Sequence, residues 1–483
     1  MSSTPRVLIV LLAAFAVAAA TPAFAADNAK KTKPAQRAPT SASAKNSAAA
    51  PAARKKTAAA TKAVATKPST KKGAAKSSAV AGRRLVVRTR VPAALPLIAI
   101  PVVDAKAVSR DAPAIAHEFN RWLDGVEASN DVSGLAAAII KDDKVLLERG
   151  VGFANAATHE RVSSDTVFRL ASLSKAFAAA MSGLLVEHGQ LHWDTRVADM
   201  LPAFTLNDVA GAQKLTVRDI LSHRVGLPHN TYDNLLEQDE PYELLVDRLK
   251  DVPLACPVGD CYGYQNIAFS LIGDVTYAAT GDFYYHQVEK RIFHPLGMDT
   301  ATYGRDALEG SKSWARPHHR TGSGWAPFVP KESYYHVPPA AGVNASIHDM
   351  EQWLIAQMGG RPNVLSPELL SVLHTPLVET EREKRASPWR RSRLLDAKYA
   401  LGWRIYDYAG TTLVFHAGAV QGYRAIIAFL PKYRFGAVMM WNCESPVPMG
   451  LMPMLIDRYL GLPEVNWAGI DHGDSSDLAG GTD

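Results

Sequence analysis

The chain has 483 residues, 47% of them hydrophobic, which is enough for at least one large domain with a substantial core. Its net charge of +6 is unevenly distributed. Residues 1–90 hold 18 Lys and Arg and the single acid Asp27, a net charge of +17, so residues 91–483 have a net charge of 6 − 17 = −11. The overall charge therefore says little about the ligands of the body, and the secretory signal described next argues against a nucleic-acid partner.

Residues 1–25 have the features of a signal peptide. Arg6 forms a small basic region, residues 7–20 are apolar and uncharged, and Ala23-Phe24-Ala25 has the small-x-small form that signal peptidase accepts. The apolar run is short for a membrane span, although an uncleaved anchor is the alternative. We expect a periplasmic or secreted protein that is not an integral membrane protein after cleavage.

Residues 26–112 are predicted to be a basic, Ala/Lys/Pro-rich disordered linker. From Ala26 to Arg84 the segment contains no aromatic residue, so it cannot bury enough apolar surface to offset its conformational entropy. A solvated spacer is the simplest interpretation. Attachment to an anionic cell-envelope polymer through the Lys and Arg side chains is the alternative.

Residues 113–462 are predicted to form the folded domain, with a flexible tail at 463–483. A helical pattern at 115–126 comes first. Two β-like runs, 135–140 and 145–151, follow on either side of Asp142-Asp143-Lys144, which predicts a hairpin. A helix of small and apolar residues is expected at 177–185.

The end of this domain is rich in β-like runs. Strands are expected at 400–406, 412–415, 423–430 and 435–441, before a last helix around 451–460 with Pro453 in its first turn. The middle of the chain is mostly helical. This order predicts an α+β fold with a central antiparallel sheet built from both chain ends, flanked by helices, and a largely helical second subdomain.

The three cysteines are Cys256, Cys261 and Cys443. Export places them in an oxidising compartment, and the turn-like residues between Cys256 and Cys261 make a local disulfide a reasonable hypothesis. Cys443 is then left as a buried thiol at a strand end. The spacing does not resemble a zinc site, and we expect neither a metal nor another cofactor.

The chemistry is expected at Ser172 and Lys175, which precede an apolar helical run. A serine hydroxyl is a weak nucleophile that needs a base, and an amine three residues further on lies on the same helix face. Burial lowers the pKa of a lysine, and a helix N-terminus offers N–H groups to an oxyanion. Ser-x-x-Lys alone is weak, because Ser69-Thr70-Lys71-Lys72 matches it too. A helix-capping serine is the structural alternative.

Three ordered motifs resemble the serine β-lactamase-related family, nearest to its class C branch, the D-alanyl-D-alanine peptidases and related esterases. They are Ser172-x-x-Lys175, Tyr264-Gln265-Asn266, and His416-Ala417-Gly418, which has the form of the family's His-x-Gly variant of Lys-Thr-Gly. Tyr232-Asp233-Asn234 competes for the second motif and ranks below it. Further stretches that fit the family are Leu221-Ser222-His223, Gly226-Leu227-Pro228, Pro295-Leu296-Gly297-Met298, Ala341-Gly342-Val343 with Asp349 and Trp353, and Leu401-Gly402-Trp403.

The resemblance implies the role of each site residue. Tyr264 would pass a proton between the Ser172–Lys175 pair and the leaving group. Asn266 would hold the Lys175 ammonium and donate to a substrate carbonyl. At the other side of the pocket, His416 would supply positive or donor character, Gly418 would let the substrate lie along the strand, and Ala419 N–H would complete the oxyanion hole with Ser172 N–H.

One departure concerns the substrate. Ala417 stands where the family has a Thr whose hydroxyl helps to hold the substrate carboxylate, and Arg424 is a candidate replacement. We expect an exported serine hydrolase that acts on amide or ester bonds through an acyl-serine intermediate, like a β-lactamase or D-Ala-D-Ala carboxypeptidase. The alternatives are an esterase of the same fold and a non-catalytic sensor that binds penicillin or peptidoglycan.

Other hydrolase classes lack their motifs in this chain. Gly-x-Ser-x-Gly is absent, which argues against an α/β-hydrolase, and His-Glu-x-x-His is absent as well. His318-His319 is expected to be a surface pair in a loop.

Overall fold

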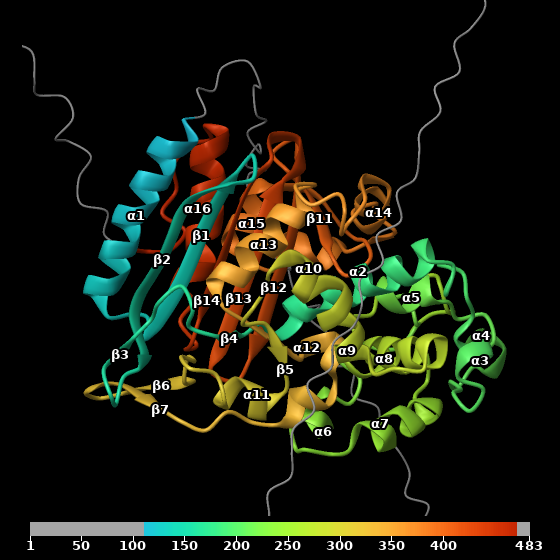
Figure 1. The fold of residues 1–483 in the computed structure, drawn as a ribbon. Coiled ribbons are helices and arrows are strands. Elements are labelled where there is room, and N and C mark those ends of the chain that lie inside the picture. The colour runs from blue at the N-terminus through green and yellow to red at the C-terminus, as the bar shows by residue number, and fades with distance from the viewer. Residues whose placement is uncertain (1–110, 471–483) are drawn as a thin grey trace, which may run out of the picture. The chain divides into compact units, whose positions relative to one another are not determined.

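The computed structural model describes residues 111–470, so the predicted signal peptide, almost all of the predicted linker and residues 471–483 lie outside the described residues (Figure 1). The described part is built on a nine-stranded antiparallel sheet. Its strands, in spatial order, are β3 (Glu160–Arg161), β2 (Lys144–Asn155), β1 (Gly134–Lys141), β14 (Phe435–Trp441), β13 (Tyr423–Leu430), β12 (Thr411–Val420), β11 (Arg404–Tyr408), β10 (Leu394–Tyr399) and β9 (Val378–Glu379).

The first and last strands of the chain meet inside this sheet. β1 pairs with β14, with Leu135 opposite Trp441, and it also pairs with β2 through the predicted hairpin. Asp142 and Asp143 form the two-residue turn, and both have the positive φ that such tight hairpins require. The prediction of an antiparallel sheet assembled from both chain ends is therefore confirmed.

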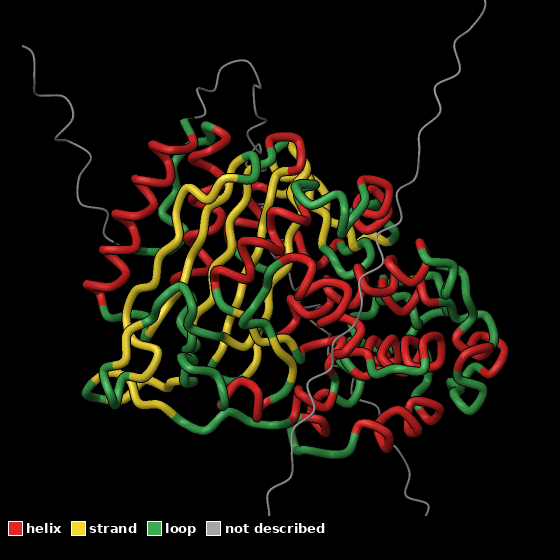
Figure 2. The backbone as a smooth tube through the Cα atoms, viewed as in Figure 1, coloured by secondary structure: helices red, strands yellow, loops and turns green. Residues whose placement is uncertain are grey.

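Helices cover both faces of the sheet (Figure 2). One face packs against α1 (Ala112–Ser129), α16 (Val447–Leu460) and α15 (Pro388–Arg393), and the other packs against α2 (Ser174–Glu187) and α13 (Ile347–Gln357). Since side chains alternate along a strand, β1 contributes to both cores and needs apolar residues at every position. Its sequence, Gly-Leu-Ala-Ala-Ala-Ile-Ile, meets that requirement.

The middle of the chain forms the predicted helical subdomain, in which α8 is the longest helix. Its helices are α3 (Val197–Met200), α4 (Val209–Ala212), α5 (Val217–Leu221), α6 (Asp233–Leu236), α7 (Tyr242–Arg248), α8 (Ile267–Thr280), α9 (Tyr284–Val288) and α10 (His294–Leu296). Smaller elements join it to the sheet: β4 (Phe168–Arg169), β5 (Thr302–Tyr303), α11 (Arg305–Glu309), β6 (His318–Thr321), β7 (Gly324–Pro327), α12 (Pro338–Ala341), β8 (Val343–Ala345) and α14 (Pro367–Leu373).

Two of the strands expected near the end of the domain differ from the structure. Residues 400–403 form a turn between β10 and β11, where the pattern predicts one strand over 400–406; Gly402 has a φ of +72°, which breaks an extended strand. β12 continues to Val420, so His416-Ala417-Gly418 lies within a strand rather than at its end.

The last helix begins earlier than predicted. α16 starts at Val447, so Pro453 lies in the helix interior and not in its first turn. An interior proline removes one helix hydrogen bond, and burial of neighbouring side chains such as Leu455 on the sheet offsets that loss. Beyond the predicted boundary at 462, Trp467 Nε1 donates to Asp457 Oδ2 across 2.9 Å, so the chain stays on the body as far as Ile470.

The cysteines follow the sequence hypothesis. Cys256 and Cys261 are joined by a disulfide with a Cα–Cα separation of 6.2 Å, and Cys443 is a buried free thiol just after β14. The expectation for His318 was wrong, because this residue is buried in β6 and its Nε2 accepts the backbone N–H of Ala156 at 3.0 Å. Within residues 111–470, no helix has both the length and the apolar character needed to cross a membrane.

Candidate active site

Ser172 lies in a 3₁₀ turn, η1 (Ala171–Leu173), immediately before α2. Ala171 adopts a left-handed backbone with φ +50°, a conformation that costs a non-glycine residue about 1 kcal/mol. Two hydrogen bonds of Ser174 Oγ stabilise the turn. The hydroxyl donates to Ala171 O at 2.7 Å, within the turn, and accepts from Val343 N at 3.0 Å, in β8. Tertiary contacts therefore fix the position of Ser172.

Lys175 is fully buried and is the second residue of α2. Its Nζ lies 3.3 Å from Ser172 Oγ, 2.6 Å from Asn266 Oδ1 and 3.1 Å from Ala340 O. A neutral amine has two N–H donors and one lone pair, so the two carbonyl oxygens can take the donors and leave the lone pair for the Ser172 hydroxyl. Burial, helped by the nearby Arg404 charge, lowers the pKa of Lys175 well below its usual value.

Tyr264 contacts both Ser172 and Lys175. Its hydroxyl donates to Ser172 Oγ across 2.8 Å, and its ring lies 4.6 Å from Lys175 Nζ. Burial raises the pKa of Tyr264 above its usual value, so the group is a neutral phenol near pH 7. The backbone N–H of Tyr264 donates to His229 Nδ1 at 3.0 Å, which anchors the segment before α8.

Asn266 links the lysine to a carboxylate that sequence reasoning missed. Its Nδ2 donates to Asp233 Oδ2 at 2.7 Å, while its Oδ1 accepts from Lys175. Burial raises the pKa of Asp233 to about 6. The competing motif Tyr232-Asp233-Asn234 thus contributes its aspartate to the site, whereas the Tyr232 hydroxyl donates to Arg248 O at 3.2 Å, away from Ser172.

Of the positive or donor character that the resemblance implies for His416, the structure does not favour the positive charge. It is fully buried, its Nε2 lies 3.1 Å from the Tyr399 hydroxyl, and its Nδ1 faces Ala417 O at 2.9 Å. Burial and the neighbouring Arg404 charge lower the pKa of His416 well below its usual value, so the ring is neutral.

The charge of Arg404, at the start of β11, acts on both Lys175 and His416. Arg404 pairs with Glu383 at 2.7 Å, and its guanidinium carbon lies 5.7 Å from the ring centres of both Tyr264 and Tyr399. Arg404 directly follows Leu401-Gly402-Trp403, a stretch that fits the family. This neighbouring stretch was the one sequence signal that could have drawn attention to Arg404.

β12 passes the nucleophile at Gly418. A methyl group there would lie 2.3 Å from Leu170 O and 3.1 Å from Ser172 N, so only glycine allows the strand this close. Ala419 is exposed and borders a cavity of about 370 Å³. The other residues lining that cavity include Arg169, Glu237, Lys331, Arg424 and Glu444.

The structure therefore brings together Ser172, Lys175, Tyr264 and Asn266, with Gly418 beside them and His416 buried behind. Within the described chain, the one cluster of three potential metal ligands lies elsewhere, on β2 and α13. A serine hydroxyl between a buried amine of lowered pKa and a phenol can attack a carbonyl carbon without a cofactor. Fold and site together define a serine hydrolase.

The comparisons identify the family. The sequence model described as Beta-lactamase matches residues 119–460, so the chain belongs to the β-lactamase family. It is 28% identical over 382 residues to the unguisins hydrolase ungD of Aspergillus violaceofuscus, covering 74% of this chain and 67% of that protein. It is 26% identical over 332 residues to penicillin-binding protein 4 of Amycolatopsis lactamdurans, covering 68% and 85%.

Solved structures agree on the fold. The octameric penicillin-binding protein homologue from Pyrococcus abyssi matches with a TM-score of 0.62 and 22% identity, covering 72% of this chain and 77% of that one. A class C β-lactamase from Rhodobacter sphaeroides matches with a TM-score of 0.56 and 22% identity, covering 71% and 99%. Among the curated relatives, the chain spans 60% of the length of protein flp from Staphylococcus aureus.

Proposed function

We propose that this chain is an exported hydrolase that cleaves an amide or ester bond through an acyl intermediate on Ser172. The observation that carries the proposal is the position of Ser172 Oγ, 3.3 Å from Lys175 Nζ and 2.8 Å from the Tyr264 hydroxyl. One neighbour can accept a proton and the other can donate one, which is what acyl transfer to a serine requires.

In the acylation step, Ser172 Oγ attacks the substrate carbonyl carbon while its proton passes to the neutral Lys175 amine. The oxyanion that forms is stabilised by the backbone N–H groups of Ser172 and Ala419. Tyr264 is hydrogen-bonded to Ser172 Oγ and donates a proton to the leaving amine or alkoxide, and the Lys175 ammonium restores it. Water then hydrolyses the ester by the reverse proton path.

The lysine is the base in this scheme because the two pKa shifts run in opposite directions. Burial lowers the pKa of Lys175 and raises that of Tyr264, so at neutral pH the amine loses its charge more readily than the phenol gains one. Asn266 and the carbonyl of Ala340 hold the amine in place.

The cavity beside Ala419 supports a substrate that carries a carboxylate. Arg424 donates to Val420 O and Tyr423 O and pairs with Glu444 at 3.4 Å, so its charge is largely engaged. Lys331 is exposed and lines the same cavity, and its Nζ donates a 3.4 Å hydrogen bond to Glu237 O. In this proposal Lys331 and Arg424, which line the same cavity, take the part of the threonine hydroxyl that Ala417 lacks.

The names of two relatives support this proposal: an unguisins hydrolase supports a hydrolase, and a penicillin-binding protein supports β-lactams as substrates. Ala417 favours a second candidate, an esterase acting on neutral acyl groups, because the strand offers no hydroxyl to a carboxylate at that point. A substrate panel separates them: a chromogenic cephalosporin, a D-Ala-D-Ala peptide and a short-chain nitrophenyl ester. Turnover of the ester alone selects the esterase.

Covalent labelling tests the proposal. A fluorescent penicillin and a fluorophosphonate probe are expected to label the full chain, and Ser172→Ala is expected to abolish both signals. Ser69→Ala is the matched control, because Ser69 belongs to the second Ser-x-x-Lys match and its loss leaves labelling unchanged. Equal labelling of Ser172→Ala and the parent protein refutes the assignment.

Export is part of the proposal and rests on residues 1–25 alone. Expression in a Gram-negative host, fractionation and N-terminal sequencing test it, with a mature chain beginning at Ala26 as the expected result. The linker then spaces the hydrolase from the cell envelope, and salt-sensitive retention on an anionic polymer would support attachment through its Lys and Arg side chains.

A further inference from the structure

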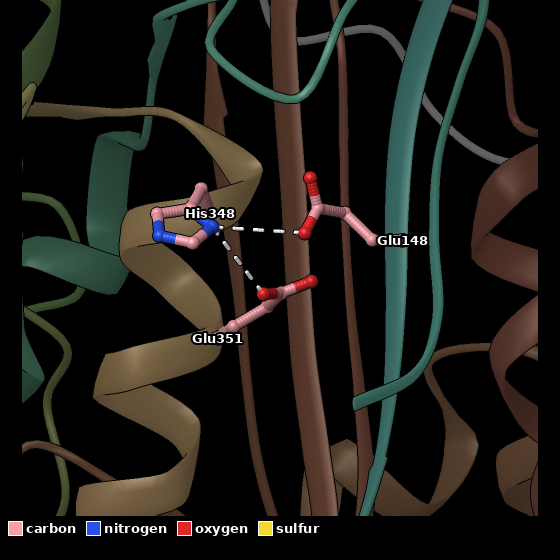
Figure 3. A group of neighbouring side chains, drawn as sticks. All are labelled: Glu148, His348 and Glu351. Carbon is pink, nitrogen blue, oxygen red and sulfur yellow. Dashed lines mark ion pairs between the residues drawn. The ribbon is translucent and has the colours of Figure 1, made fainter. Parts of the chain in front are cut away.

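Three ligand-bearing side chains gather between β2 and α13, outside the site described above (Figure 3). Glu148 comes from β2, and His348 and Glu351 come from the first turns of α13. One ligand atom of each residue lies within 4.8 Å of the others. Among residues 111–470 no other group of three His, Cys, Asp or Glu side chains meets that condition.

Local structure aims all three at one point. The capping box of Ser346 and Asp349 fixes the first turn of α13, and residues three apart on a helix share a face, so His348 and Glu351 point the same way. Glu148 pairs with Ala138 of β1, which belongs to the core on the α13 face of the sheet. The glutamate on the strand therefore faces the helix.

The distances fit a shared cation better than direct hydrogen bonds. His348 Nδ1 lies 3.6 Å from Glu148 Oε2 and 3.7 Å from Glu351 Oε2, both beyond hydrogen-bond length. Ligands about 2.1 Å from a tetrahedral zinc ion are separated by roughly 3.4 Å. A small inward movement of two side chains brings these atoms to that spacing.

The two glutamate carboxylates of this cluster also favour the binding of a cation. The Glu351 side chain is 1% exposed and its Oε1 has no hydrogen-bond partner, while the sole ion pair of Glu351 and of Glu148 in the described chain is with His348. A buried carboxylate without compensation is costly, and a second carboxylate beside it adds repulsion. The imidazole brings one positive charge at most, and only when protonated.

We propose that Glu148, His348 and Glu351 bind one divalent transition-metal cation, for which Zn²⁺ is the best fit. Imidazole nitrogen with two carboxylates suits Zn²⁺ better than Mg²⁺ or Ca²⁺, which prefer oxygen ligands alone. His348 is 53% exposed, so solvent reaches the site and water completes the coordination. The cation joins α13 to the edge of the sheet, and its role is structural and independent of the hydrolase reaction.

A bound proton is the alternative to a metal ion for reducing the negative charge of Glu148 and Glu351. Burial and the neighbouring Glu148 carboxylate raise the pKa of Glu351, which favours a protonated carboxyl when no cation is bound. A metal ion must displace that proton. Because metal ligands must be deprotonated, zinc binding is expected to release a proton and to tighten as pH rises.

Calorimetric titration of the full chain with Zn²⁺ tests the proposal, in two buffers of different ionisation enthalpy. We expect one site per chain with proton release, no comparable binding of Mg²⁺, and a rise in melting temperature on zinc addition. Glu351→Gln is expected to weaken zinc binding at least tenfold, since even groups that only orient ligands cost 10- to 100-fold. It is also expected to leave the metal-free melting temperature close to that of the parent protein, because glutamine matches a protonated glutamic acid in size and carries no charge.

His348→Ala is the second variant, and His286→Ala is its matched control. His286 lies on α9, is similarly exposed, and has its Nδ1 3.1 Å from Asp282 Oδ1. Replacing His286 is expected to leave the zinc affinity unchanged. Anomalous scattering from zinc-soaked crystals of the unmodified protein gives the position directly. A peak between Glu148 and His348 supports the proposal. Unchanged affinity in both site variants, or a zinc ion bound only elsewhere, overturns it.

Discussion

Lys175 Nζ donates a 2.6 Å hydrogen bond to Oδ1 of Asn266, which ties the helix behind the nucleophile to the start of α8. Asn266 donates in turn to Asp233, so three segments distant in sequence act on one amine. Tertiary contacts therefore set the orientation of the Lys175 amine toward Ser172. Replacing the residues that make these contacts should change kcat/KM or its pH dependence.

Replacing Lys175 is expected to remove the general base. Lys175→Met should lower kcat/KM for a nitrophenyl ester by about 10³-fold, the range that general-base groups contribute. Lys175→Arg should be as inactive, because a guanidinium stays protonated and cannot accept the Ser172 proton. Steady-state kinetics check this, with circular dichroism to confirm folding. An arginine variant within tenfold of the parent would contradict the assigned role.

The pH profile should report the same amine. Activity requires neutral Lys175, so kcat/KM should rise with pH through a pKa well below that of free lysine. The Asp233 carboxylate raises the pKa of Lys175 and the Arg404 charge lowers it. Asp233→Asn should therefore move this limb to lower pH, and Arg404→Met should move it to higher pH.

Asp274→Asn is the control for this pair of shifts. Asp274 lies on α8 and accepts a 2.8 Å hydrogen bond from Tyr242, and it does not contribute to the electrostatics of Lys175. Its replacement should leave the limb in place. Shifts of the same sign in Asp233→Asn and Arg404→Met would show that a group other than Lys175 governs the profile.

The disulfide should be present and measurable in the exported protein. Titration of thiols in denatured, unreduced protein should find one per chain, Cys443, and the native protein should react slowly because that thiol is buried. Removing Cys256 and Cys261 together by serine substitution should lower the free energy of unfolding by about 2 kcal/mol, from the entropy of a six-residue loop. Three reactive thiols in denatured protein would disprove the pairing.

Asp457 should be a major contributor to stability. Its carboxylate receives two hydrogen bonds from Arg393, at 2.9 and 3.0 Å, and others from Tyr408 and Trp467, and both members of the ion pair are buried. Asp457→Ala leaves the guanidinium buried and unpaired, which costs about 3–5 kcal/mol. Urea denaturation measures it. A loss under 1 kcal/mol would mean that water reaches Arg393.

The sequence predicted the sheet well, because its signals are local. The apolar runs of β13 and β14 are bounded by turn residues, and the structure reproduces both ranges, 423–430 and 435–441. The turn at 400–403 was missed because the apolar pattern continues through it, and the break depends on the backbone of Gly402. The start of α16 was missed because Pro453 has the appearance of an N-terminal signal.

The site was predicted in part, for a similar reason. Ser172, Lys175, Tyr264 and Asn266 stand in short motifs, so their spacing is readable, and the structure brings them together. Asp233 and Asn266 are 33 positions apart in the sequence, so no local sequence pattern predicts their hydrogen bond. The neutral state of His416 depends on its burial, and the Glu148–His348–Glu351 cluster depends on a strand and a helix 200 positions apart.

Mass spectrometry of the trapped intermediate tests the central claim most directly. The full chain is mixed with a β-lactam or an activated ester, quenched in acid within seconds, and digested for peptide mapping. One added acyl mass is expected on the peptide that contains Ser172, and none in Ser172→Ala. An acyl group on another residue, or an adduct that survives in Ser172→Ala, would contradict it.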